Sequence, residues 1–309
     1  MSGVEPIGAP VPPGNPGPAG DVIHDLGFRH YDGPRLGRGW VVRSLLVETV
    51  RGVFGLGRPA RSKIMPWVLI GILLAPPLVI ALSVLLTRSR ELPLSYTAYP
   101  VAMQLVVTLF VAGAAPYCVS RDLRHGVMPL YLSRPMTRAD YVLAKVAGLS
   151  LALFAVLASA ETLLLVGALL AKLPVGDQLG GWAGGLVTVA VLSVLLAVIG
   201  LVVAAVTPRR GLGVAAIITG LVVITGVAQL LTAIASERGY DALASYLPVL
   251  DPYRLVDALA ARVLGVGAAD GMTYPAGVGG ALVLAAILAA VVAGGLALLV
   301  RRYRKGGGL

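Results

Sequence analysis

The sequence is poor in the residues on which most soluble enzymes depend. Only 13% of its residues are charged and 6% are aromatic, whereas 57% are hydrophobic, and the whole chain has one cysteine, Cys118. A single cysteine cannot form a disulfide within one chain, so nothing indicates an oxidising compartment. The low charge content and a mean hydropathy of +0.87 lie far outside the range of soluble domains and indicate a polytopic membrane protein.

Lysine and histidine, which carry much of enzyme chemistry, are equally scarce. The chain has four lysines and none follows a glycine, so it lacks the Gly-Lys-Ser/Thr motif of a phosphate-binding loop and is not an ordinary P-loop ATPase. Its three histidines, His24, His30 and His125, lie outside the long apolar runs, which leaves none for an intramembrane haem or zinc site. We therefore expect no catalytic residue, no metal site and no cofactor bound by this chain.

Long uncharged stretches are abundant instead. Six of them approach the roughly 20 residues that a helix needs to cross a bilayer. The predicted spans cover residues 64–86, 98–120, 146–170, 182–206, 211–234 and 277–300. Pro76 and Pro77 fall near the middle of the first span, where they should free main-chain carbonyls that neighbouring groups must then satisfy. The predicted fold is an all-α polytopic membrane protein with six transmembrane helices.

The chain before the first span has two parts. Residues 1–39 are rich in proline and glycine, contain basic residues and should be disordered in the cytoplasm. Residues 40–56 show a polar and an apolar face with helical periodicity, which predicts an amphipathic helix lying in the membrane interface. The polar face carries Ser44, Glu48, Arg51, Gly52 and Gly55, the apolar face carries Val42, Leu46, Val50 and Phe54, and the residues expected at the membrane surface are Trp40, Arg43, Glu48 and Arg51. An ordinary packing helix on the cytoplasmic side is the alternative.

Basic residues are distributed unevenly between the two sides of the predicted spans. With the amino terminus in the cytoplasm, 19 of the 25 lysines and arginines fall on the cytoplasmic side. This excess agrees with the positive-inside rule and predicts a multi-pass protein of the cell membrane with both termini cytoplasmic. It places 121–145 and the basic tail 301–309 inside and the long connection 235–276 outside, and it accounts for the net charge of +10 without a nucleic-acid partner.

Two helix starts can be read from the connecting segments. Thr137 followed by Asp140 has the form of a capping box, which should begin the third long helix well before that helix enters the bilayer. In the external connection, Asp251 suits an N-cap and Pro252 the first turn of a short helix that Gly265 ends. We expect this short helix to rest on the membrane surface or to dip into it.

One acidic residue lies within a predicted span. Placing the charge of Glu161 inside the bilayer would cost roughly 2.5–3.5 kcal/mol, so its carboxyl group needs a polar partner or a proton. It is either part of a pathway for substrate or protons, or a structural group hydrogen-bonded to a neighbouring helix. Gln104 in the second span presents the same two alternatives.

The charged segment between the second and third predicted spans carries the most specific pattern. From Arg121 to Lys145 it reads R-D-x-R-x-G-x-x-x-x-Y-L-S-R-P-x-x-R-x-x-Y-x-x-x-K. This run resembles the cytoplasmic loop of ABC-2-type transporter permeases, and the six-span layout, the amphipathic amino-terminal helix and the long external connection are similar to the type V exporter-like architecture of that family. The similarity extends from about residue 40 to the end of the chain. Pro129 departs from it, because many relatives carry a glutamate there.

The resemblance implies the transmembrane permease subunit of an ATP-driven exporter. Separate cytoplasmic ABC ATP-binding subunits would bind ATP and Mg²⁺, and a second permease chain, identical or different, would complete the pathway among the membrane lipids. The implied contact with the ATPase is the loop, through Arg121, Asp122, Arg124, His125, Gly126, Arg134 and Arg138. Such a chain is not itself an enzyme.

Two other functions are compatible with these residues. A non-transporting membrane subunit could use the basic loop to anchor or assemble a cytoplasmic partner, and basic loops also bind lipid headgroups. An intramembrane enzyme acting on lipid could use Glu161 as its acid, although no second acid, histidine or lysine accompanies it within the predicted spans.

Overall fold

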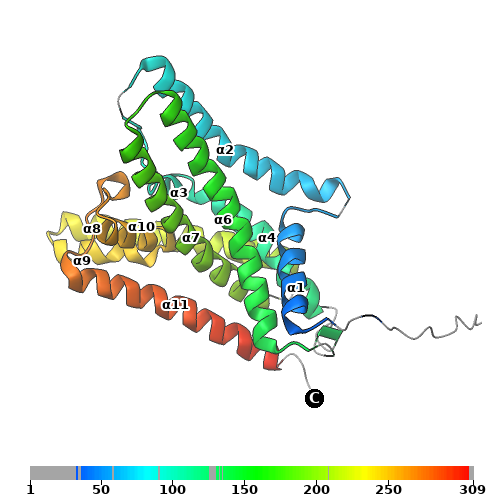
Figure 1. Cartoon of the computed structure of the whole chain (residues 1–309). Coiled ribbons are helices and arrows are strands. Elements are labelled where there is room, and N and C mark those ends of the chain that lie inside the picture. The colour runs from blue at the N-terminus through cyan, green and yellow to red at the C-terminus, as the bar shows by residue number, and fades with distance from the viewer. Residues whose placement is uncertain are drawn as a thin grey trace, which may run out of the picture. The chain divides into compact units, whose positions relative to one another are not determined.

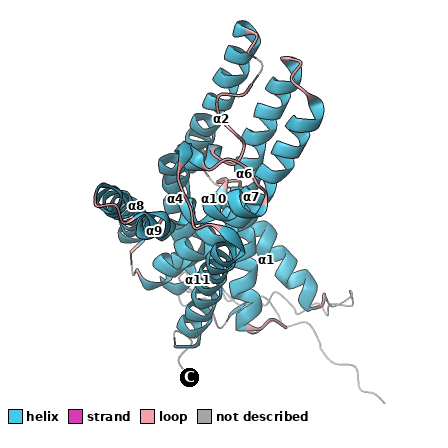
Figure 2. Ribbon diagram, turned by 90° about the vertical axis from the view of Figure 1, so that its left-hand side faces the viewer, coloured by secondary structure: helices cyan, strands magenta, loops and turns pink. Residues whose placement is uncertain are grey.

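The fold is known from a computed structural model that describes residues 33, 36–57, 59–89, 91–124, 130–131, 133, 135–207 and 209–305. The chain divides into two units, Met1–Arg35 and Leu36–Leu309, and the fold concerns the second. In its described residues all regular structure is helical (Figure 1, Figure 2). The predicted disorder of the amino terminus falls mostly outside the described residues, and the first helix begins slightly earlier than expected, at Arg38.

The helices follow one another with short connections. In chain order they are α1 (Arg38–Val53), α2 (Arg61–Thr87), α3 (Tyr99–Ala102), α4 (Gln104–Arg124), α6 (Arg138–Leu170), α7 (Val175–Val206), α8 (Arg210–Glu237), α9 (Asp241–Tyr246), the 3-10 helix η1 (Leu247–Leu250), α10 (Pro252–Val263), the 3-10 helix η2 (Ala269–Gly271) and α11 (Gly277–Lys305).

Five of these helices, α2, α6, α7, α8 and α11, are long and apolar enough to cross a membrane. They correspond to five of the six predicted spans. The remaining prediction, one span over 98–120, is wrong as a continuous helix, because the backbone leaves helical values at Met103 (φ −99°, ψ 14°) and separates α3 from α4. The apolar part of α4, Gln104–Val119, is shorter than the other five. Sequence hydropathy averaged over a span does not detect this break, because the segments on both sides of it are apolar apart from Gln104.

The core of the fold lies along α6 and α7, which are side by side in Figure 1. Half or more of the most apolar stretch of each is buried within the protein, whereas less than a quarter is buried in α2, α8 and α11. The outer helices therefore present large apolar side chains to their surroundings, as a protein in a lipid bilayer requires. α2 and α1 pack on α6, and α4 and α11 pack on α7.

Glycines permit close contact between several helix pairs. A Cβ atom at Gly148 of α6 would lie 2.7 Å from the Thr49 Cβ of α1, and one at Gly200 of α7 would lie 2.8 Å from the Val111 Cγ1 of α4. Both distances are shorter than side chains tolerate, so only glycine allows these backbones to approach so closely. Small residues have this role in membrane helix packing because apolar lipid provides no hydrophobic force between the helices.

The buried face of α1 differs from the predicted one by one residue along the chain. Val41, Leu45, Thr49 and Val53 are buried, together with Gly52, which the periodicity assigned to the polar face. A Cβ at Gly52 would lie 2.5 Å from the Tyr117 ring of α4, so the absence of a side chain lets α1 pack against this tyrosine. The helix is thus seated on α6 and α4 through its buried face.

Between α8 and α11 the chain forms short helices that pack against the spans. Asp251 is the N-cap of α10, as predicted: its Oδ1 accepts a hydrogen bond from the Tyr253 main-chain N–H at 3.0 Å, and Pro252 occupies the first turn. Oδ2 of Asp251 accepts from the Thr225 hydroxyl of α8 at 3.0 Å. The hydroxyl groups of Tyr253 and Thr108 of α4 lie 2.9 Å apart, which connects α10 to a second long helix.

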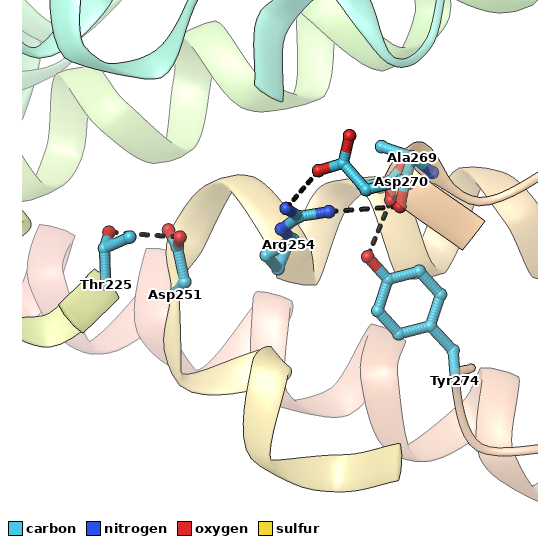
Figure 3. A network of polar contacts seen from close by, with 7 residues as sticks. Thr225, Asp251, Arg254, Ala269, Asp270 and Tyr274 are labelled. Atoms are coloured by element: carbon cyan, nitrogen blue, oxygen red, sulfur yellow. Dashed lines mark hydrogen bonds and ion pairs between the residues drawn. The ribbon is translucent and has the colours of Figure 1, made fainter. Parts of the chain in front are cut away.

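A second set of polar contacts fixes the far side of α10 (Figure 3). Arg254 donates to the Ala269 carbonyl at 3.1 Å and pairs with Asp270 at 2.5 Å. Oδ2 of Asp257 accepts from the Ala269 N–H at 3.0 Å and from the Tyr274 hydroxyl at 2.6 Å. Burial nevertheless raises the pKa of Asp257 above its ordinary value. These bonds and those of Asp251 and Tyr253 hold the connection between α8 and α11 against the helices, so it is an integral part of the fold.

Candidate coupling site at the ends of α4 and α6

The predicted ATPase contact corresponds to the connection between the end of α4 at Arg124 and the start of α6 at Arg138. Arg121 lies with Arg124 in the last turn of α4, and Arg138 is the first, partly exposed residue of α6. The predicted contact residues His125, Gly126 and Arg134, and the unusual Pro129, lie outside the described residues. We refer to residues 125–137 as the α4–α6 loop.

Asp122 has a different environment from the one expected of a docking residue. Its Oδ2 lies 3.0 Å from the Lys145 Nζ and accepts a hydrogen bond from the Tyr141 hydroxyl at 2.5 Å. The side chains of Asp122 and Lys145 are only 16% and 11% exposed. A pair this far removed from solvent is held by mutual attraction and by hydrogen bonds, since either charge alone would be costly to bury. Asp122 therefore points toward α6 and joins the end of α4 to it.

Aromatic rings extend this cluster to a third helix. The Tyr141 ring stacks edge-on against Tyr303 in the last turn of α11, with 5.1 Å between the ring centroids. Tyr131 of the α4–α6 loop lies 5.4 Å from Tyr141 on another side. The ammonium group of Lys145 lies 5.5 Å from the Tyr141 ring centroid, within the range of a cation–π contact. We call Asp122, Tyr141, Lys145 and Tyr303 the junction cluster.

The start of α6 is fixed by the predicted capping box and by a contact with α1. The Thr137 hydroxyl accepts from the Asp140 N–H at 3.2 Å, and the Asp140 carboxylate accepts from the Thr137 N–H at 2.8 Å. The same carboxylate accepts two hydrogen bonds from the Arg38 guanidinium, at 2.6 and 2.8 Å. A bidentate pair of this kind fixes orientation as well as distance. It ties the first turn of α1 to the first turn of α6.

The surface residues predicted on the amino-terminal helix are exposed. Trp40 is 52% exposed, and Arg43, Glu48 and Arg51 also face outward. Together they line a shallow hollow along α1 that reaches Tyr117 of α4. Their position leaves them available to lipid or to a protein partner.

Glu161 is completely buried, at 0% exposure, in α6. Among the described residues neither of its carboxylate oxygens has a hydrogen-bond partner. A Cβ at Gly185 of α7 would lie 2.7 Å from Glu161 Oε2 and 2.8 Å from the Tyr96 Cβ, so the three residues pack tightly. The Tyr96 hydroxyl donates to the Gln178 Oε1 at 2.9 Å, and burial raises the pKa of Tyr96 to about 12, which keeps this donor protonated.

Gln104, the other polar residue proposed for a pathway, is the first residue of α4. Its Oε1 is buried and has no hydrogen-bond partner in the described part of the chain. No hydrogen bond joins it to Glu161 there. The structure therefore brings Asp122 together with Lys145 and Tyr141 of α6, and it leaves Glu161 and Gln104 as separate features.

Sequence reasoning overlooked several residues that organise the site. Tyr141 and Lys145 were part of the noted motif but received no role, and Arg38 and Tyr303 were not considered. One signal was present: Tyr141 and Lys145 are four residues apart, so they share a helix face directly after the capping box. Nothing local could have linked Asp140 to Arg38, which is 102 residues away.

The fold and the site together define a multi-pass helical membrane protein with a charged loop tied to the ends of three helices. The family model described as ABC-2 family transporter protein matches residues 91–305, more than two thirds of the chain. The chain therefore belongs to the ABC-2 transporter family, and it is a membrane component of such a transporter. Members of this family are typically the non-catalytic transmembrane part and work with ATPase subunits. A search of curated proteins found no match.

Proposed function

We propose that this chain is the permease of an ATP-driven exporter. Separate cytoplasmic subunits bind ATP and Mg²⁺, and a second permease chain, identical or different, completes the pathway. The observation that carries the proposal is the ion pair of Asp122 with Lys145 at the base of the α4–α6 loop. Because this pair links the last turn of α4 to α6, force applied to the loop moves both helices together as a rigid body.

The tyrosines of the junction cluster extend the moving unit. Tyr141 contacts Tyr303 at the end of α11, so a displacement of the loop also reaches that span. When the ATPase subunits close, the force on the loop is shared by α4, α6 and α11. No single helix end has to bend under it. Rigid transmission of this kind is what a coupling element needs, because a flexible loop would absorb the movement.

Helix α1 supplies the second contact with the ATPase. It is fastened to α6 at one end by Arg38 and Asp140 and along its length by the close approach of Thr49 to Gly148. Its exposed residues are Trp40, Arg43, Glu48 and Arg51. α1 therefore moves with α6 and presents a polar face to a partner or to lipid headgroups.

The docking surface consists of the basic residues around the loop. These are Arg121, Arg124, His125, Arg134 and Arg138, with Gly126 at the turn between them, and ions at a loop suit a polar interface between separable subunits. Asp122 has a different role in this proposal: it positions the loop and does not itself contact the ATPase. The excess of lysine and arginine at this end of the helices supports a cytoplasmic location for the loop and both termini, in the cell membrane.

Purification of the tagged full-length chain in mild detergent tests the docking. We expect a co-purifying subunit that carries a phosphate-loop motif and hydrolyses ATP. The double variant Arg124→Ala, Arg138→Ala should retain less of the ATPase subunit than the wild type. The control variant Arg238→Ala, at the C-terminal end of α8, should retain the wild-type amount. Equal retention in the loop variant and the control, or no ATPase with the wild-type chain, contradicts the proposal.

A second measurement separates a transporter from an anchoring subunit that binds the same partner. A cysteine is introduced at Gln178, beside Tyr96, in a Cys118→Ala background, and its labelling is followed in the purified complex. ATP should change the labelling rate if the complex alternates between conformations. An unchanged rate with active ATP hydrolysis would instead identify an anchoring or assembly subunit.

A further inference from the structure

One hollow in the described residues lies between α1, α2 and α4 and is also lined by Arg210, the first residue of α8. It has a volume of about 300 Å³. Its walls are mostly apolar and include Met65, Leu69, Phe110 and Ala114, and Arg210 lies at its edge. We call it the α1–α2–α4 crevice. An apolar crevice with a cation at its mouth has the chemistry of an amphiphile site.

The crevice is a neighbour of the hollow along α1. Gly52 and Tyr117, which pack against each other, line both spaces. The second hollow, about 570 Å³ in volume, is lined by Arg43 and Arg51. Glu48 is its one acidic lining residue. Arginines thus outnumber acids along the combined surface, which favours an anionic ligand.

The adjoining helix ends add to the positive potential. Neither α2 nor α8 has an acidic residue in its first turn, where acids are normally favoured by the helix dipole. Arg210 begins α8 and lies at the end where the dipole repels a cation. An anion bound beside Arg210 would relieve this repulsion.

We propose that the α1–α2–α4 crevice binds one anionic phospholipid. The phosphate lies between Arg51 of α1 and Arg210 of α8, and an acyl chain enters the apolar crevice beside Leu69 and Phe110. The occupant is a lipid because the anion-binding edge is continuous with an apolar space that a free phosphate would leave unfilled. A membrane supplies both the anionic headgroup and the acyl chain that this site would bind. Basic residues near the membrane surface attract anionic headgroups.

The bound lipid would also affect α1. This helix contacts α6 and α4 through small residues, and a lipid in the α1–α2–α4 crevice would fill the space beside Gly52 and Val53. Anionic lipid should therefore stabilise the seating of α1 and, through Arg38 and Asp140, the start of α6. Regulation of the transporter by membrane composition follows as a consequence.

The test uses the full-length chain and titrates phosphatidylglycerol or phosphatidylcholine in native mass spectrometry. Phosphatidylglycerol should bind more tightly than phosphatidylcholine. Replacing Arg51 and Arg210 together by glutamine should weaken phosphatidylglycerol binding about thirtyfold, since each basic residue near an anionic lipid contributes about tenfold or less. The matched control is Arg88→Gln with Arg238→Gln, which removes two arginines from the other ends of α2 and α8 and should leave the affinity unchanged.

A variant that fills the crevice provides an independent readout. Ala114→Phe places a large side chain in the space assigned to the acyl chain and should abolish the preference for phosphatidylglycerol, with thermal unfolding in phosphatidylcholine used to confirm folding. Soluble glycerol phosphate should not compete. Equal affinity for the two lipids, equal loss in the control variant, or full competition by glycerol phosphate would overturn the proposal; the last result would identify a free-phosphate site. The arginine variants lie on the surface and remain informative if Ala114→Phe does not fold.

Discussion

The hydroxyl group of Tyr99 in α3 donates a hydrogen bond to the main-chain carbonyl of Leu73 in α2. In a regular helix this carbonyl would accept from the N–H of residue 77, but that residue is a proline and has none. Tyr99 is fully buried, so no water replaces the missing donor. The side chain of one helix thus completes the hydrogen bonding of another within the apolar part of the protein.

Tyr99→Phe should lower the free energy of unfolding by about 1–3 kcal/mol, because it leaves the Leu73 carbonyl buried without a donor. Thermal unfolding of the protein in detergent measures the change. Tyr240→Phe is the matched control, since Tyr240 is 60% exposed and the same atom is removed there. Equal stability of Tyr99→Phe and the control would show that the hydrogen bond contributes nothing.

The relationship also shows how far the sequence can predict this fold. The two prolines in the first span predict unsatisfied carbonyls, and Thr137 and Asp251 predict helix starts, because caps and proline effects depend on residues close in the chain. The donor for Leu73 cannot be predicted, since it comes from a helix that the hydropathy pattern merges with α4. The break at Met103 leaves no trace in a sequence that is apolar on both sides.

The same holds for the candidate site: features set by residues close in the chain could be predicted, and features set by packing between helices could not. The motif from Arg121 to Lys145 locates the loop and resembles that of the family to which the chain belongs. It does not show that Asp122 turns toward Lys145. The residues around an aspartate at the edge of a loop are the same whether its side chain faces a partner protein or a neighbouring helix. Burial of that kind is decided by packing between α4, α6 and α11, which no local pattern records.

Breaking the pair of Asp122 and Lys145 should destabilise the protein strongly. Lys145→Met leaves a largely buried carboxylate without its cation and should cost about 3–5 kcal/mol, and Asp122→Asn leaves the ammonium group in the same position. The double variant should be more stable than the sum of the two losses predicts, because neither charge is then stranded. Chemical denaturation of all four proteins measures the coupling, and strictly additive losses would contradict a direct interaction.

Gly185→Ala should destabilise the packing of α7 against Glu161 and Tyr96. The added methyl group would lie 2.7 Å from Glu161 Oε2 and 2.8 Å from Tyr96 Cβ, so the neighbours must move at a cost of about 1–3 kcal/mol. Gly226→Ala in α8 is the control, because nothing lies within 4 Å of its Cβ position. There the helix should gain about 0.5–1 kcal/mol from the better helix former. Unfolding temperatures of the two variants should therefore change in opposite directions.

The connection between α8 and α11 should give the stability of the protein a measurable pH dependence. Because burial raises the pKa of Asp257, the folded protein holds this proton more tightly than the unfolded chain. Its stabilising contribution is present below the unfolded pKa and is lost as the pH rises through the folded pKa, by at most about 1.4 kcal/mol per pH unit. Asp257→Asn cannot titrate, so its stability relative to the wild type should improve as the pH rises above about 4. A difference that is constant over this range, or that changes in the opposite direction, would show that Asp257 does not titrate differently on folding.

Glu161→Gln should leave the stability almost unchanged. The carboxyl group is fully buried and has no hydrogen-bond partner among the described residues, so retaining its charge would require desolvation without compensation. We therefore expect it to be protonated, and glutamine has nearly the same shape and no charge. The free energy of unfolding should change by less than about 1 kcal/mol, and a much larger loss would show that the native residue is ionised. With stability retained, the ATP-dependent labelling of residue 178 distinguishes the two remaining roles. A change equal to that of the wild type indicates a structural group, whereas its loss in an intact complex indicates that a proton on Glu161 must leave and return during the cycle.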